Sequence, residues 1–128
     1  MGRVSELEAF LHGHKPEPVA LFRRFQELVE ACGPSELVVR KSIVYWRRSR
    51  IFAGAWPEGS RLELNVDLLR EAEHPAKLVA FHHTKRVLTH RLRIERPEQL
   101  DAALADLLAE SYAEVGPGTR KRVHESHI

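Results

Sequence analysis

Apolar side chains recur at helical spacing near both ends of the chain. Pro18–Cys32 places its apolar residues on one side and most of its charged residues on the other, and Gly33 and Pro34 then end the helix in the usual way. Pro97–Val115 repeats the pattern, with proline at the favoured first helical position. Together with a short helix over Ser5–Leu11, the pattern predicts two long amphipathic helices that flank the middle of the chain.

The middle of the chain changes to β-branched and aromatic residues separated by short polar turns. Arg61–Val66 alternates strictly, which predicts that Leu62, Leu64 and Val66 face the core. The strands before it are apolar on both faces and therefore need cover on both sides. We expect about five strands, at Ile43–Trp46, Ile51–Trp56, Arg61–Val66, Lys77–His83 and Arg86–Ile94, with Leu37–Arg40 as an extra strand or an extension of the first.

These elements predict an α+β fold of two layers, with an antiparallel sheet of about five strands and both long helices packed on one face. Strands joined by short turns make a meander the simplest topology. Asp67 is expected to cap a short helical turn over Leu68–Glu73. At 128 residues the chain has the length of one domain, which we place at residues 1–116, followed by a basic tail at residues 117–128.

Composition is that of a globular protein, with 43% hydrophobic and 30% charged residues. No apolar run approaches the length of a membrane span, and the N-terminus lacks an apolar signal region. The single cysteine, Cys32, lies on the apolar stripe of its helix, where a small core residue is expected rather than a reactive thiol. We therefore expect a cytoplasmic protein without membrane contact.

Charge is segregated along the chain, although the net charge is only +2. Residues 37–56 contain basic residues and no acid, and residues 77–96 contain six basic residues against one acid. Residues 97–118 reverse this pattern, with five acids and no Lys or Arg. The distribution predicts basic strands, acidic helices and a molecule with two electrostatically different sides.

The basic residues of the strands are interleaved with aromatic residues. Because arginines hold phosphates and exposed rings stack on bases, the strand side is a candidate contact for an anionic partner such as nucleic acid. The alternative is a solvated turn whose aromatic residues belong to the core. The candidate binding residues are Arg40, Lys41, Tyr45, Trp46, Arg47, Arg48, Arg50, Arg91 and Arg93, and the tail residues Arg120, Lys121 and Arg122 are a further phosphate contact or a plain basic terminus.

His90 is a separate candidate, because it lies on the apolar face of its strand between Leu88 and Leu92. It is either a core histidine satisfied by a hydrogen bond or an acid or base in a pocket between sheet and helices. No companion carboxylate stands at a diagnostic spacing, so we assign no catalytic residue and favour a protein that is not an enzyme.

Eight histidines invite a search for metal sites, with His12 and His14, and His82 and His83, as the obvious pairs. Neighbours in a strand point to opposite faces, so His82 and His83 cannot both bind one ion without distortion. No cysteine or carboxylate framework of known metal spacing accompanies them. We expect neither a metal nor another cofactor.

A set of core and turn residues supports a family resemblance: Phe10-Leu11-His12-Gly13, Leu21-Phe22, Tyr45, Arg50-Ile51-Phe52-Ala53, Leu62-Glu63-Leu64, Thr89-His90-Arg91 and Tyr112. In this order the chain resembles the domain of unknown function family numbered 5655 over residues 7–115. The resemblance implies a small bacterial-type α+β domain and supplies no catalytic residues. Segments similar to it occur alone or appended to nuclease-like domains, which favours nucleic acid as a partner by association only.

The sequence is compatible with three hypotheses for the function of the protein. The preferred one is a small binding module that contacts an anionic partner, such as nucleic acid, through its basic strand side. The second is a small-molecule-binding protein or enzyme with a pocket near His90. The third is homodimerisation, because Trp46, Phe52 and Trp56 are expected to leave an apolar patch on the open sheet face, unless the tail or the first helix covers it.

Overall fold

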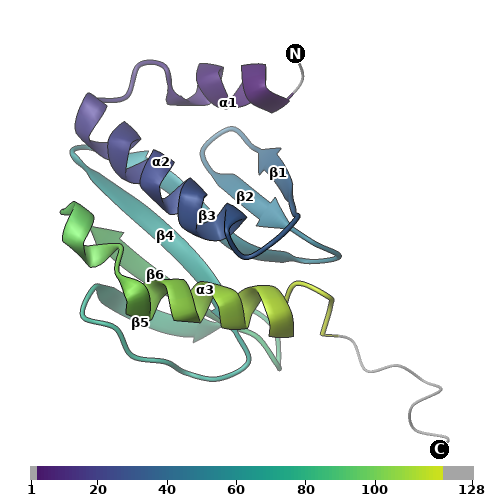
Figure 1. Cartoon of the computed structure of the whole chain (residues 1–128). Coiled ribbons are helices and arrows are strands. Elements are labelled where there is room, and N and C mark those ends of the chain that lie inside the picture. Colours follow the sequence, from purple (N-terminus) through teal and green to yellow (C-terminus); the bar gives the residue numbers. More distant parts are fainter. Residues whose placement is uncertain (1–2, 120–128) are drawn as a thin grey trace, which may run out of the picture.

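The computed structural model describes residues 3–119 and shows an open antiparallel sheet of six strands with three α-helices (Figure 1). The helices are α1 (Arg3–Leu11), α2 (Pro16–Glu30) and α3 (Ala102–Glu114). The strands are β1 (Glu36–Val39), β2 (Val44–Arg47), β3 (Ile51–Glu58), β4 (Arg61–Leu68), β5 (Lys77–His82) and β6 (Leu88–Ile94). The α+β class is confirmed, and the sixth strand arises because β1 is a strand of its own. The predicted tail beyond Thr119 lies outside the described residues.

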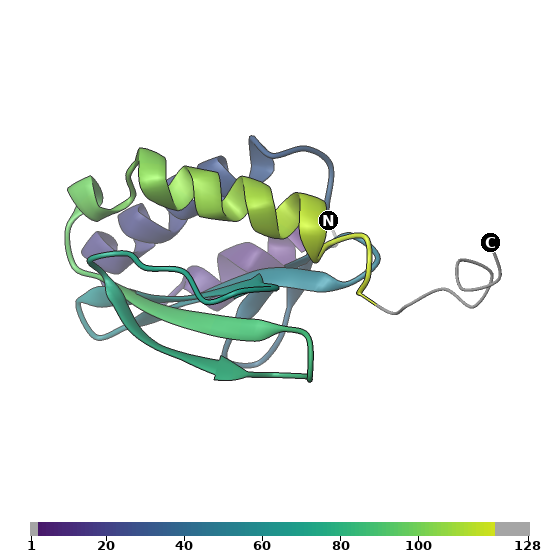
Figure 2. The ribbon, with the colours of Figure 1, turned by 90° about the horizontal axis from the view of Figure 1, so that it is seen from below.

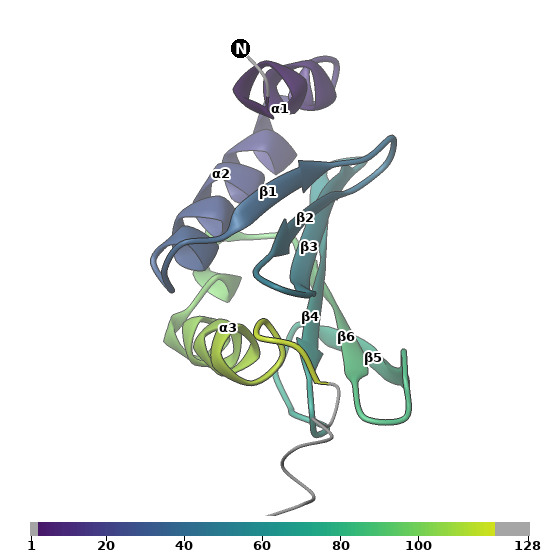
Figure 3. The same cartoon turned by 90° about the vertical axis from the view of Figure 1, so that its right-hand side faces the viewer.

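Both long helices lie on one face of the sheet and leave the other face open (Figures 2 and 3). The alternation predicted for β4 is confirmed, because Leu62, Leu64 and Val66 are fully buried under the helices. The helices contribute Phe22, Phe25 and Val29 from α2 and Leu104 and Leu108 from α3. The apolar stripes read from the sequence therefore make one core between the two layers.

Helix α1 packs at one end of the sheet beside β1 (Figure 3). Leu7 and Leu11 join the core cluster, so the short helix closes that end of the core. None of the helices within residues 3–119 is long and apolar enough to cross a membrane.

The strand order is β1-β2-β3-β4-β6-β5, so the predicted meander is correct only through β4. Strand β6 lies between β4 and β5 and pairs along its whole length with Leu62–Leu68 of β4. The reason is burial: Leu92 and Ile94 of β6 are almost completely buried, whereas β5 is exposed along most of its length. The more apolar strand takes the covered position, and β5 becomes an edge.

The helical turn expected after Asp67 is not formed. Strand β4 continues to Leu68, and residues 69–76 form an irregular connection to β5. Asp67 is therefore a strand residue, and its side chain lies on the open face beside Thr89 of β6. Proline at position 75 and the lack of an apolar stripe in this segment are consistent with a loop.

A β-bulge decides where the aromatic residues of β3 point. Trp46 pairs with Ala53 and Arg47 pairs with Ile51, which leaves Phe52 as the extra residue. Phe52 is fully buried, and its ring meets Tyr112 of α3 edge-on at 5.4 Å between centroids. Trp46 is buried as well, between Phe22 and Phe25 of α2. The predicted apolar patch of the open face is therefore wrong for Trp46 and Phe52, and only Trp56 remains half-buried.

The last helix begins later than expected. Pro97 opens a short 3-10 turn, Pro97–Gln99, and α3 starts after Asp101. The Asp101 carboxylate accepts a hydrogen bond from the Leu104 N–H at 2.9 Å and also from His74 at the same distance. Burial alone raises the pKa of the Asp101 carboxyl, but these hydrogen bonds outweigh it and leave the pKa below its ordinary value.

Candidate ligand groove on the open sheet face

One row of residues runs across the uncovered face of the sheet. Tyr45 lies opposite Gly54, Gly54 opposite Asn65, and Asn65 opposite Arg91 on four neighbouring strands. Gly54 leaves room for the tyrosine ring, because a Cβ at this position would lie 3.0 Å from Tyr45 Cδ1. The absence of a side chain at Gly54 therefore lets the ring of Tyr45 lie close to the sheet surface.

Two hollows adjoin along this row and share Tyr45 and Asn65, and we call them together the open-face groove. The first has a volume of about 570 Å³ and the second about 700 Å³. Residues that line the first include Arg47, Arg50, Ile51, Asp67, Phe81, His83 and Thr89. Residues that line the second include His14, Lys41, Trp56, Glu58 and Arg91.

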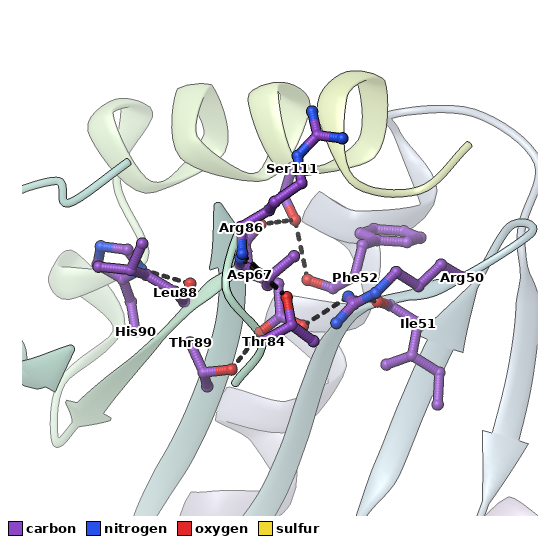
Figure 4. A network of polar contacts seen from close by, with 11 residues as sticks. Arg50, Ile51, Phe52, Asp67, Thr84, Arg86, Leu88, Thr89, His90 and Ser111 are labelled. Atoms are coloured by element: carbon purple, nitrogen blue, oxygen red, sulfur yellow. Dashed lines mark hydrogen bonds and ion pairs between the residues drawn. The ribbon is translucent and has the colours of Figure 1, made fainter. Parts of the chain in front are cut away.

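The polar floor of the first hollow is built around Asp67, which is 8% exposed (Figure 4). Its carboxylate accepts a hydrogen bond from the Thr89 hydroxyl at 2.7 Å and forms an ion pair with Arg50 at 2.9 Å. Arg50 also donates to the carbonyl of Ile51 at 2.7 Å. The guanidinium of Arg50 is therefore held in place by two acceptors, at the wall of the hollow.

Several other arginines of the open face are paired with acids. Arg47 binds Glu36 with an N–O distance of 2.6 Å. Arg61 and Arg93 both bind Glu63, each at 2.8 Å. Burial alone raises the pKa of the Glu63 carboxyl, but the hydrogen bonds and charges of the two arginines outweigh burial and lower it. Part of the positive charge counted in the sequence is thus neutralised within the sheet.

The second hollow contains a stacked pair. The guanidinium carbon of Arg91 lies 4.9 Å from the centre of the Trp56 ring, and its Nε donates to the side-chain oxygen of Asn65 at 3.3 Å. A cation over the face of a tryptophan ring is an attractive arrangement. The pair presents a flat ring and a positive charge side by side at the groove.

The structure brings together about half of the residues predicted for binding. Lys41, Tyr45, Arg47, Arg50 and Arg91 line the open-face groove. Arg93 is on the same face, where Glu63 holds it. Arg40 is exposed at the β1–β2 turn and lines neither hollow.

Two predicted binding residues lie on the helix side instead. Trp46 is 1% exposed in the core. Arg48 lies over the ring of Tyr112, 4.2 Å from its centre, and donates to the Tyr112 carbonyl at 3.0 Å. These two predicted binding residues therefore do not lie with the others on the open face, because alternation and the turn direct them to the helix side.

His90 is a core residue, 2% exposed, and it lines neither hollow. One ring nitrogen accepts a hydrogen bond from the Ala72 N–H at 2.9 Å, and the other lies 3.2 Å from the Leu88 carbonyl (Figure 4). With both nitrogens occupied inside the core, the geometry offers no support for a pocket at His90.

Some residues of the groove are not among the binding residues predicted from the sequence, including Trp56, Asn65, Asp67, Phe81 and Thr89. Alternation along β4 already predicts that Asn65 faces outward, and this signal was sufficient to find it. For Asp67 the sequence predicts a helix cap, and Phe81 belongs to a strand whose place at the sheet edge only the topology reveals.

Metal-binding side chains are not clustered in the described part of the chain. No group of three or more His, Cys, Asp or Glu residues within residues 3–119 lies close enough to hold an ion. Cys32 is half-buried, and its thiol donates to the Leu28 carbonyl at 3.6 Å. Burial raises the pKa of the Cys32 thiol, which lowers its reactivity as a thiolate.

The fold and the groove define a class of protein, an α+β domain whose open antiparallel sheet carries a polar and aromatic groove on its uncovered face. The chain belongs to the family described as Domain of unknown function (DUF5655), whose family model matches residues 7–114. The resemblance noted in the sequence is therefore confirmed. No curated protein and no solved structure matches the chain significantly.

Proposed function

We propose that the open-face groove binds single-stranded nucleic acid. The observation that carries the proposal is the gathering of aromatic rings and arginines on one uncovered sheet face. Tyr45 and Trp56 line the open-face groove together with Arg47, Arg50 and Arg91. Phe81, on the edge strand β5, adds a third ring to the groove. Rings of this kind stack on bases, and arginines hold the phosphates between them.

The charge pattern favours a single strand over a duplex. A duplex presents mainly phosphates to a sheet surface, and its binding depends on many unpaired cations. Here Arg47 and Arg50 share their charge with Glu36 and Asp67. A single strand gains stacking in addition to charge, and the amide of Asn65 can hydrogen-bond to a base edge.

The polar floor suits binding better than catalysis. The hydroxyl of Thr89 is directed at Asp67, and Asp67 is also held by Arg50. Thr89 is 5% exposed and Asp67 is 8% exposed, so both reactive groups are engaged with each other below the surface. Because these groups are hydrogen-bonded to one another, they can position a ligand but do not present a free nucleophile.

Fluorescence anisotropy with labelled single-stranded and duplex oligonucleotides tests the proposal. We expect single strands to bind more tightly than duplexes at low salt. Tyr45→Leu should weaken binding about tenfold through the loss of stacking, and Arg91→Gln should weaken it several-fold through the loss of a phosphate contact. Circular dichroism should show that both variants are folded.

Arg24→Gln is the matched control, because Arg24 is exposed on α2 at the helix side and its loss changes the net charge by the same amount. It should leave binding nearly unchanged. No binding at low salt, or equal effects of Arg24→Gln and Arg91→Gln, overturns the proposal. Binding to duplexes at least as tight as to single strands overturns the choice of the single strand.

A further inference from the structure

Strand β5 is an open edge that is also apolar. It is the last strand of the sheet, with β6 on one side and, within residues 3–119, no strand on the other. The exposed large hydrophobic residues of the described chain all lie on it: Leu78 is 49% exposed, Val79 47% and Phe81 43%. Native edge strands are usually protected by charges, prolines or a covering element, and an apolar edge of this kind marks a pairing surface.

The backbone of this edge is available for pairing. The His83 N–H donates to the Val87 carbonyl across the β5–β6 hairpin at 2.8 Å. Because backbone groups alternate in direction along a strand, those of Ala80 and His82 point away from β6. The free edge therefore presents hydrogen-bonding groups next to the exposed side chains of Val79 and Phe81.

The two ends of β5 carry opposite charge. At its start, Lys77 is held by Glu71 at 2.9 Å and Glu73 at 3.0 Å, and these carboxylates are 59% and 83% exposed. Two acids against one lysine make this end negative. At the other end, His82 is the last residue of the strand and His83 and Lys85 follow it; all three are exposed, and Lys85 makes this end positive.

We propose that β5 pairs with β5 of a second copy of this chain, antiparallel and about a two-fold axis. Antiparallel pairing brings the acidic start of one strand to the basic end of the other, twice, whereas parallel pairing brings like charges together. With Ala80 opposite itself, Val79 lies opposite Phe81 of the partner subunit, and such pairs of aliphatic and aromatic side chains stabilise sheets.

The pairing joins the two sheets into one. Residues directly opposite each other in an antiparallel pair lie on the same face, so the two open-face grooves face the same side. Phe81 lines the groove, so each groove reaches the junction.

Sedimentation velocity of the full chain at high micromolar concentration should show a dimer. Ala80→Pro removes an outward N–H and should yield a monomer, and a proline at a free edge is compatible with the fold. Phe81→Lys is a second variant that should weaken the dimer at least about tenfold, because it places a charge in the apolar contact. Circular dichroism reports whether each variant is folded.

Charge exchange tests the antiparallel direction. Glu73→Lys and Lys85→Glu should each weaken the dimer about tenfold at low salt, because each makes both contacts between the ends repulsive. Glu71 still holds Lys77 in the first variant. An equimolar mixture of the two variants should recover a dimer as tight as the wild type, because both contacts then become attractive.

A wild-type chain that is monomeric at high micromolar concentration overturns the proposal. So does a dimer that is unchanged by Phe81→Lys and by a folded Ala80→Pro variant. A mixture of the charge variants that stays as weak as either variant alone overturns the antiparallel arrangement.

Discussion

At the scale of single residues, Glu63 neutralises part of the positive charge of the open face. It lies on the open face but is only 4% exposed, because Arg61 and Arg93 lie over it from two strands. The three side chains form a small network in which the buried carboxylate is satisfied by two charged donors. Its loss leaves two arginines without their acceptor.

Glu63→Gln should reduce the free energy of unfolding by about 1–3 kcal/mol at neutral pH, measured by urea denaturation. The pKa of Glu63 is lowered in the folded state from an ordinary value of 4.5. Its contribution is therefore complete above pH 4.5 and is lost as the pH falls through the folded-state pKa. The difference between wild type and variant should narrow in acid.

Glu58→Gln is the matched control, because Glu58 is exposed at the end of β3. It should change stability by less than about 0.5 kcal/mol. A gap between wild type and Glu63→Gln that stays constant from neutral to acid pH contradicts the role given to this carboxylate.

At the scale of elements, Ser111 fastens α3 to the sheet. Its hydroxyl is fully buried and lies 2.9 Å from the Phe52 carbonyl and 2.5 Å from the Asp67 carbonyl (Figure 4). These carbonyls belong to the bulge of β3 and the end of β4. The contact therefore links the helix to the two strands that shape the first hollow of the groove.

Ser111→Ala should lower the free energy of unfolding by about 1–2 kcal/mol, because the hydrogen bond from this hydroxyl to a buried carbonyl is lost. Ser60→Ala, in the exposed β3–β4 turn, is the control and should have little effect. Denaturation curves of the two variants decide the matter. Equal stability of both variants would show that the hydroxyl contributes nothing.

Among the elements, sequence patterns predict the buried faces of some, but they do not predict the position or side-chain direction of others. Strand β4 and the stripe of α2 were predicted because each needs only its own periodicity and one covering layer. The direction of Phe52 depends on a bulge between two strands, and the edge position of β5 depends on β6 being the better partner for β4. Both depend on how two strands pair with each other, and the residue pattern within one strand does not predict that pairing.

At the scale of the whole molecule, the basic strand side is less basic than the sequence indicates. The segment of residues 37–56 has no acid of its own, but folding brings Glu36 to Arg47 and Asp67 to Arg50. Lys41 and Arg91 also line the groove. Among the described residues, neither of them forms an ion pair with a carboxylate. Binding to nucleic acid is accordingly expected to be weak and to depend on few phosphates.

The logarithm of the binding constant for a single strand should fall with the logarithm of salt concentration with a slope of about −1 to −3. Such a slope corresponds to about two to four phosphate contacts. Lys41 and Arg91 would make two of them, and Arg47 and Arg50 would contribute less because each is already paired with an acid. Arg91→Gln should make the slope shallower by about 0.7, and the Arg24→Gln control should leave it unchanged. A slope near zero contradicts phosphate contacts in the groove.

The sequence by itself determined the α+β class, the two helical stripes, the inward face of β4 and the family resemblance, because these depend on periodicity and on the order of residues. The tertiary structure alone decided which aromatic residues reach the open face, which arginines meet an acid, and which strand is left at the edge. Strand order and register set those contacts, and they depend on the relative burial of whole strands distant in sequence.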